Sequence, residues 1–115
     1  MAGRPSIQLT PLHRVEWAHA VAQHVFRRTL SNQEAARTYA AFEADRDLDL
    51  WVDVEMPDAA YETAVQLAKR YGPRLGVRTL DTLHVASALE LGAREFWTFD
   101  ERQEKLARAA GLSIS

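Results

Sequence analysis

Apolar and polar residues near the N-terminus alternate first with the period of a strand and then with that of a helix. Residues 6–10 alternate over a short run, which predicts a strand. Apolar side chains then recur at helical spacing as far as about Arg28. Thr10 suits the N-cap of this helix, and Pro11 suits its first position. The pattern therefore predicts a strand followed directly by a long helix.

The middle of the chain adds a second helix, a second strand and a third helix. Ser31 and Glu34 have the spacing of a capping box, which predicts the start of the second helix. Residues 49–54 alternate again and predict a strand. Residues 57–58 favour the start of a third helix, and the glycines and proline within residues 72–76 predict a loop that ends it.

The last third of the chain begins with a helix over residues 79–91 that is apolar on nearly every side. A helix of this kind is buried, and Gly92 suits the position just after its end. The further elements expected are a strand over 95–99, a helix over 101–110 that Asp100 caps, and a short strand over 112–114.

The alternation of strands and helices predicts an α/β domain with a parallel sheet and helices on both of its faces. We expect the 115 residues to form one domain. The absence of cysteine excludes disulfides and thiolate metal sites. No apolar run approaches the roughly 20 residues that span a bilayer, and the N-terminus lacks the apolar core of a signal peptide. A soluble cytoplasmic protein without membrane association is therefore expected.

The charge of the chain gives a mixed indication about partners. A net charge of −2 carries no global signature of nucleic-acid binding. However, 12 of the 14 basic residues are arginine, with a series at Arg70, Arg74 and Arg78. Arginine suits bidentate contacts to phosphate. A coding bias towards arginine and alanine is the alternative explanation, and both stay open.

Asp81 lies in the first turn of the apolar helix, with His84 one turn further along. A buried carboxylate needs hydrogen-bonding partners or a metal ion. The helix dipole also favours an acid at this position, by roughly 0.3–1 kcal/mol. Asp81 is thus either a site residue or a helix cap. His84 is either part of the same site or a hydrogen-bonded histidine of the core or its rim.

Asp100 and Glu16 are two further candidate acids. Asp100 follows a strand, close to Thr98, and ligands bind at the carboxyl ends of strands in open α/β sheets. Capping of the last helix explains Asp100 without any function. Glu16 shares a helix face with His13, a spacing that is also common on solvated surfaces. Carboxylates brought to strand ends favour a divalent-metal site.

Three segments resemble the acid-bearing segments of the PIN-domain ribonucleases, and within that family those of the VapC-type toxins of bacterial toxin–antitoxin pairs. They are residues 9–16, 78–86 and 98–107, and the similarity extends over about residues 6–114. The resemblance implies a three-layer α/β/α domain. It also implies that Glu16, Asp81 and Asp100 bind Mg²⁺ or Mn²⁺ and catalyse RNA cleavage, with Thr98, Arg78 and His84 in support. Carboxylate oxygens suit such ions, which lower the pKa of a bound water.

The chain departs from the family pattern at its N-terminus. PIN domains of this type begin with a strand that ends in Asp, whereas residues 1–15 contain no Asp or Glu. The resemblance therefore implies a PIN domain that lacks its first strand and first acid, with impaired catalysis. Unpaired strand edges would then favour a homodimer or larger assembly.

Two alternatives to a toxin-type endoribonuclease stay open. One is a non-catalytic PIN-like interaction protein that binds an antitoxin-like partner. The other is a small α/β domain without a metal site, in which the acids serve only as helix caps. Convergence of Glu16, Asp81 and Asp100 would favour the enzyme over this last alternative.

Overall fold

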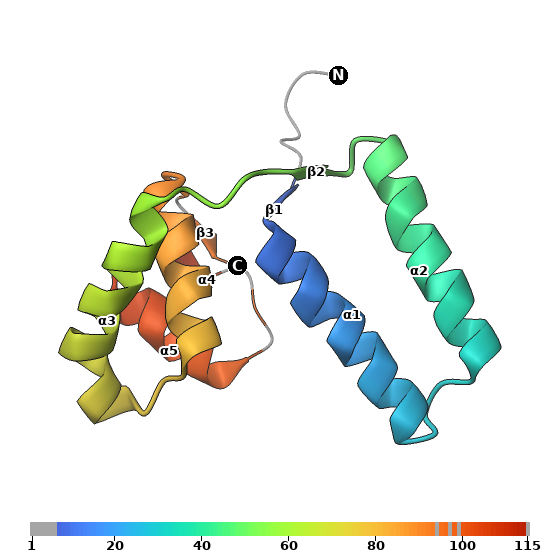
Figure 1. Ribbon diagram of the computed structural model, residues 1–115, viewed down its shortest axis with the longest axis horizontal. Coiled ribbons are helices and arrows are strands. Elements are labelled where there is room, and N and C mark those ends of the chain that lie inside the picture. The colour runs from blue at the N-terminus through green and yellow to red at the C-terminus, as the bar shows by residue number, and fades with distance from the viewer. Residues whose placement is uncertain (1–6, 94, 97, 99, 115) are drawn as a thin grey trace. The chain divides into compact units, whose positions relative to one another are not determined.

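The computed structural model describes residues 7–93, 95–96, 98 and 100–114. These residues form two compact units, one running to Glu55 and the other starting at Met56 (Figure 1). Among the described residues, no helix is both long enough and apolar enough to cross a membrane.

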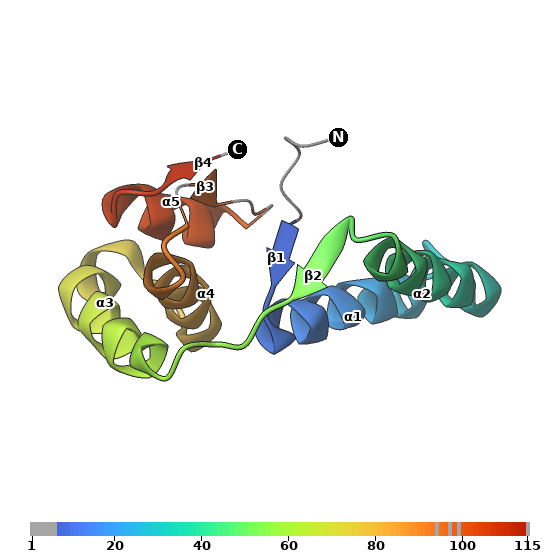
Figure 2. The same cartoon turned by 90° about the horizontal axis from the view of Figure 1, so that it is seen from above.

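The described residues of the first unit form two strands and two helices. They are β1 (Ile7–Leu9), α1 (Pro11–Phe26), α2 (Asn32–Asp47) and β2 (Trp51–Asp53). The two strands are parallel, with Ile7 opposite Trp51 and Leu9 opposite Asp53. They lie side by side at the N-terminal end of α1 (Figure 2).

Both helices of the first unit begin with the caps that the sequence predicts. The Thr10 hydroxyl accepts the His13 N–H at 3.4 Å, and Nδ1 of His13 accepts the Thr10 N–H at 3.1 Å. At α2 the Ser31 hydroxyl accepts the Glu34 N–H at 3.0 Å, and the Glu34 carboxylate accepts the Ser31 N–H at 2.9 Å. The Ser31 N–H that donates to the Glu34 carboxylate, followed by the Ser31 side chain, holds the pKa of this carboxyl below its ordinary value of 4.5.

Aromatic rings fill the space between α1, α2 and β2. The Phe42 ring stacks on Trp17 at 4.0 Å and on Trp51 at 4.5 Å between ring centroids. Tyr39 meets the Trp17 ring edge to face at 5.5 Å. The indole N–H of Trp51 donates to the Phe42 carbonyl at 2.8 Å, so the ring is fixed in orientation as well as in position.

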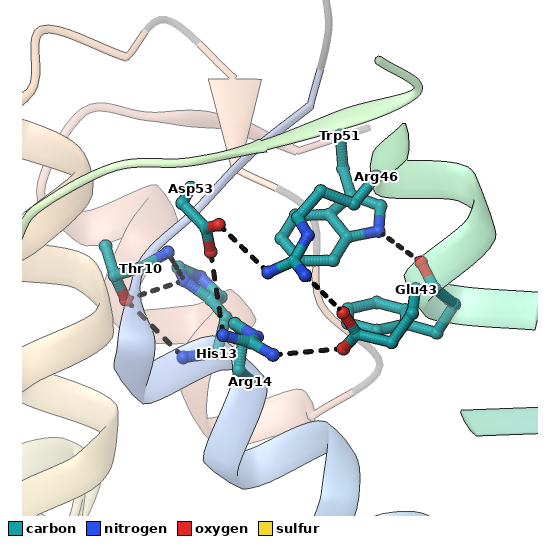
Figure 3. Close-up of polar contacts among 8 residues, drawn as sticks. Thr10, His13, Arg14, Glu43, Arg46, Trp51 and Asp53 are labelled. Atoms are coloured by element: carbon teal, nitrogen blue, oxygen red, sulfur yellow. Dashed lines mark hydrogen bonds and ion pairs between the residues drawn. The ribbon is translucent and has the colours of Figure 1, made fainter. Parts of the chain in front are cut away.

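Four charged side chains surround Trp51 (Figure 3). The guanidiniums of Arg14 and Arg46 lie over the indole ring, at 5.6 and 5.5 Å from its centroid. Glu43 accepts from both, at 3.0 Å from Arg14 and 2.7 Å from Arg46. Asp53 lies 3.8 Å from Arg14 and 3.3 Å from Arg46. Two positive charges on one ring are therefore balanced by two carboxylates.

In the part of the second unit that the structure describes, there are three helices and two short strands. They are α3 (Ala59–Leu75), α4 (Thr79–Glu90), β3 (Glu95–Phe96), α5 (Glu101–Ala109) and β4 (Ser113–Ile114). The strands are parallel, with Glu95 opposite Ser113 and Phe96 opposite Ile114. The α/β class and the parallel pairing expected from the sequence are thus confirmed.

Aliphatic side chains from every helix of the second unit build one continuous core. It draws on α3, α4, α5 and both strand regions, and is closed by partly buried residues such as Leu75 and Leu89. Its fully or nearly fully buried members are Ala60, Ala64, Leu67, Tyr71, Val85, Ala86, Phe96, Leu106, Ala107 and Leu112.

One expected boundary is wrong, because α3 runs through Gly72 and Pro73 to Leu75. Gly76 ends the helix in the left-handed conformation, with φ +64°, and its N–H donates to the Gly72 carbonyl at 2.9 Å. A proline removes a single backbone N–H donor, and in the last turn the helix continues without that one hydrogen bond. Of the strand expected over 95–99, β3 covers Glu95–Phe96, and residues 97 and 99 lie outside the described residues.

Candidate functional site

Asp81 is a buried carboxylate at the beginning of α4. Its residue is 2% exposed, and Oδ2 accepts the backbone N–H of Arg78 at 2.8 Å. The Nε of Arg78 lies 4.0 Å from the same oxygen. The carboxylate is therefore held at the helix N-terminus by an N–H donor and a nearby positive charge.

The rest of α4 carries polar side chains into the core without leaving their hydroxyls unsatisfied. Thr82 donates to the Thr79 carbonyl at 2.8 Å, and Ser87 donates to the Leu83 carbonyl at 2.7 Å. His84 is 1% exposed. Of the two possibilities for His84, a core and a rim histidine, its burial favours the core. A direct role in a site stays a prediction.

Asp100 caps α5, as one of the two sequence interpretations expects. Its Oδ1 accepts the N–H groups of Arg102 at 2.8 Å and Gln103 at 3.4 Å. Thr98 supports this turn, because its hydroxyl accepts the Asp100 N–H at 3.0 Å and donates to the Gln103 side chain at 3.0 Å. Among described contacts, Thr98 thus orders the backbone that carries Asp100.

Gln103 is a residue that the sequence analysis missed. It lies on a strongly polar helix, where an amide gives no signal of burial, yet it is one of the buried polar residues of the second unit. Its position is explained by the bond to Thr98. A polar residue three positions after an N-cap aspartate was the available clue.

Glu16 and His13 lie on α1 in the first unit, and Glu16 is half-buried. Nδ1 of His13 is engaged by the Thr10 N–H, so the structure explains this histidine as part of a helix cap. Asp81 and Asp100 belong to the second unit. The convergence of Glu16 with them stays a prediction. Within the described residues, no three His, Asp or Glu side chains form a metal-binding group.

Capping and metal binding are compatible functions for Asp81 and Asp100. The described contacts of Asp81 fall on Oδ2, and those of Asp100 fall on Oδ1. A carboxylate has two oxygens with about four lone-pair sites, so a helix N-terminus occupies only part of its capacity. The cap fixes the carboxylate in place and leaves an oxygen of the type that Mg²⁺ and Mn²⁺ prefer. The donor chemistry of these residues therefore fits a hard divalent ion.

Comparison with protein-family models matches residues 9–109 to the family described as PIN domain. The matched range includes Glu16, Asp81 and Asp100. Searches of curated proteins and of solved structures gave no significant match.

Proposed function

The chain belongs to the PIN domain family, and from this premise we propose that it is a metal-dependent endoribonuclease of the toxin–antitoxin type. Family membership indicates nuclease-type function, and PIN domains in general depend on divalent metals. The observation that carries the finer proposal is the buried, oriented carboxylate of Asp81. We also propose that residues 1–115 act as one PIN-like domain, because the family match runs through both units.

Glu16, Asp81 and Asp100 are the proposed metal ligands and catalytic residues. A bound Mg²⁺ or Mn²⁺ would supply an activated water and neutralise charge on the scissile phosphate. Asp81 enters this role already oriented by the Arg78 N–H, which reduces the reorganisation needed to bind an ion. Thr98 orders the backbone of Asp100, because its hydroxyl accepts the Asp100 N–H. Arg78 lies beside Asp81 with two-thirds of its side chain exposed, and in this proposal its guanidinium contacts an RNA phosphate.

We expect the activity of the 115-residue chain to be weak, because residues 1–15 contribute no carboxylate. Affinity for a divalent ion depends on the number of charged ligands, and poorer positioning of the attacking water costs orders of magnitude in rate. In-frame residues upstream of Met1 that supply a fourth acid would raise both the affinity for the ion and the rate of cleavage.

Cleavage of single-stranded RNA with Mg²⁺ or Mn²⁺ tests the proposal. We compare the chain with Asp81→Asn, which keeps an oxygen for the Arg78 N–H but removes the negative charge. Asp58→Asn is the matched control, because Asp58 is exposed and its side chain makes no cap hydrogen bond. Cleavage that Asp81→Asn abolishes and Asp58→Asn leaves unchanged supports the enzyme. Cleavage that survives Asp81→Asn contradicts it.

Self-association is a further part of the proposal. Parallel strands are almost always found inside larger sheets covered on both faces, whereas β1 and β2 pair with each other as a two-stranded ribbon among the described residues. Such edges favour pairing with another chain. Size-exclusion chromatography with light scattering should show a homodimer or a larger species, and a stable monomer would contradict this expectation.

A non-catalytic protein that binds an antitoxin-like partner is the second candidate. It is favoured by the apolar surface of the α1–α2 hairpin, where Phe26 is 87% exposed and Val15 is 57% exposed. Inertness towards RNA with both metals, in the 115-residue chain and in one lengthened upstream of Met1, would support this candidate over the enzyme.

A further inference from the structure

Two arginines of the second unit lie over one buried ring. The guanidinium carbon of Arg70 is 5.3 Å from the centroid of the Tyr71 ring, and that of Arg74 is 5.7 Å from it. Both arginines are exposed, whereas Tyr71 is 8% exposed. Among the described residues, neither guanidinium has a carboxylate within ion-pair distance.

The ring beneath these arginines is fixed. Its hydroxyl donates to the Ala109 carbonyl of α5 at 3.1 Å, and its body belongs to the aliphatic core of the unit. A rigid aromatic surface restricts the two long side chains before any ligand arrives. An incoming anion therefore loses less binding free energy to the ordering of flexible arginines.

Trp51 in the first unit provides the internal contrast. It also lies beneath two guanidiniums, at nearly the same distances, but Glu43 and Asp53 neutralise them. Folding alone thus accounts for that arrangement. Folding does not account for the arginine pair at Tyr71, because like charges four residues apart on a helix repel each other. The helix dipole favours Arg74 in the last turn of α3, yet Arg70 lies before that turn.

We propose that Arg70 and Arg74, held on Tyr71, form a binding site for the phosphate backbone of single-stranded RNA. This inference rests on the proposed function and identifies the surface that holds the substrate. The planar guanidinium matches a phosphate through two parallel hydrogen bonds. Exposed Lys69 adds a third positive charge to the same stretch of α3.

The site leads towards the candidate acid along the chain. Arg78 lies four positions after Arg74, a span of at most about 14 Å even when the chain is fully extended. Arg78 contacts Asp81 through its backbone N–H and its guanidinium. An RNA strand held at Arg70 and Arg74 therefore lies within a short reach of the buried carboxylate.

RNA binding without cleavage tests the inference. We measure fluorescence anisotropy of labelled oligouridylate and oligoadenylate in EDTA, at several salt concentrations, for the whole chain and for Arg70→Gln/Arg74→Gln. Loss of two phosphate contacts should weaken binding of both oligonucleotides about tenfold and reduce the salt slope by about 1.4. Both substituted residues are exposed, and thermal melting checks that the variant remains folded.

Arg108→Gln is the matched control. It removes one positive charge from the same unit, but Arg108 is already paired with Glu104 at 3.2 Å. We expect its RNA affinity to stay within about twofold of the unaltered chain. An equal loss in Arg108→Gln, or no loss in the double variant, overturns the inference, because the effect then depends on net charge or on another surface.

Two further outcomes separate this site from the proposed function. Failure of the unaltered chain to bind RNA overturns the site, even where Asp81-dependent cleavage upholds the enzyme. The expected weakening of RNA binding in the double variant upholds the site, even where no metal supports cleavage. Competition by polyglutamate at lower concentrations than by RNA overturns the inference in favour of an acidic protein partner.

Discussion

The two units of this protein are stabilised in different ways. In the first, α1 and α2 bury few aliphatic side chains, and the main contacts are stacked aromatic rings with four charged residues around Trp51. In the second, ten buried residues among those described, from three helices and two strand regions, share one core. Stability in the first unit is therefore concentrated in single residues, and in the second it is distributed.

The two units also differ in the charge around a shared feature, a pair of arginines over an aromatic ring. Each has two guanidiniums over one aromatic ring, but among the described residues only the pair at Trp51 has carboxylate partners. The balanced pair joins α1, α2 and β2. The unbalanced pair retains its attraction for anions. Charge balance, and not the aromatic contact, distinguishes the structural arginine pair from the proposed binding site.

Trp51→Ala is expected to have the largest effect. Truncation of a buried tryptophan costs about 3–5 kcal/mol, and here it also removes the ring beneath Arg14 and Arg46. Hydrogen exchange should show lost amide protection in β1, α1, α2 and β2, with protection retained in α3 to α5. Equal loss in both units would mean that they unfold together, which would break the comparison.

Leu106→Ala tests the distributed core of the second unit. Leu106 is 0% exposed, and its truncation should cost about 2–5 kcal/mol, lowering the urea midpoint while leaving the unit folded. Leu48→Ala is the control, because Leu48 is 70% exposed and should change stability by less than about 0.5 kcal/mol. Complete unfolding in Leu106→Ala would show that this core, too, depends on one residue.

Ser31→Ala removes the capping oxygen of α2 and should destabilise the first unit by about 1 kcal/mol in urea unfolding. Ser31→Thr retains a hydroxyl and should stay close to the unaltered chain.

The pH dependence of stability checks the same cap. Because folding lowers the pKa of Glu34, its ionisation stabilises the folded state above pH 4.5. This contribution is lost as the pH falls through the lowered pKa of the folded state. Glu34→Gln should therefore destabilise the protein at neutral pH and have a diminishing effect in acid. An effect that persists undiminished in acid would contradict the assigned cause.

Glu43→Gln sharpens the comparison with the smallest change in stability. The side chains of Glu43, Arg14 and Arg46 are about 40% exposed. The loss in free energy of unfolding should therefore be below about 1 kcal/mol and should shrink as salt is added. The substitution leaves Arg14 and Arg46 with a reduced counter-charge, which resembles the state of Arg70 and Arg74. We expect RNA affinity at low salt to rise. Unchanged affinity would show that charge balance alone does not decide function.

Local features of the fold were predictable from the sequence, because short-range hydrogen bonds decide them. Thr10, Ser31 and Asp100 cap their helices as their residue types and spacing indicate. The end of α3 was not predictable from Pro73, because the choice depends on whether Gly76 closes the helix. The family match confirms the PIN resemblance that the segments around Asp81 and Asp100 indicated.

Long-range features were only partly accessible. The apolar surroundings of Asp81 predicted its burial, but a sequence cannot show that the Arg78 N–H holds the carboxylate. The arginine series was visible, whereas the ring beneath Arg70 and Arg74 depends on a bond between Tyr71 and Ala109, 38 residues apart. Such contacts are set by the packing of α3 on α5, for which no local pattern exists.

The short bond between the Arg78 amide and Asp81 gives the protein an internal spectroscopic reporter. An amide proton that donates to a carboxylate is sensitive to the charge on that carboxylate. An ion drawn to the other oxygen of Asp81 changes the electron density at the bonded one. The Arg78 cross-peak in a ¹H–¹⁵N correlation spectrum should therefore move during a titration with Mg²⁺. The occupancy of the proposed centre can be followed through one backbone resonance, with neither substrate nor turnover.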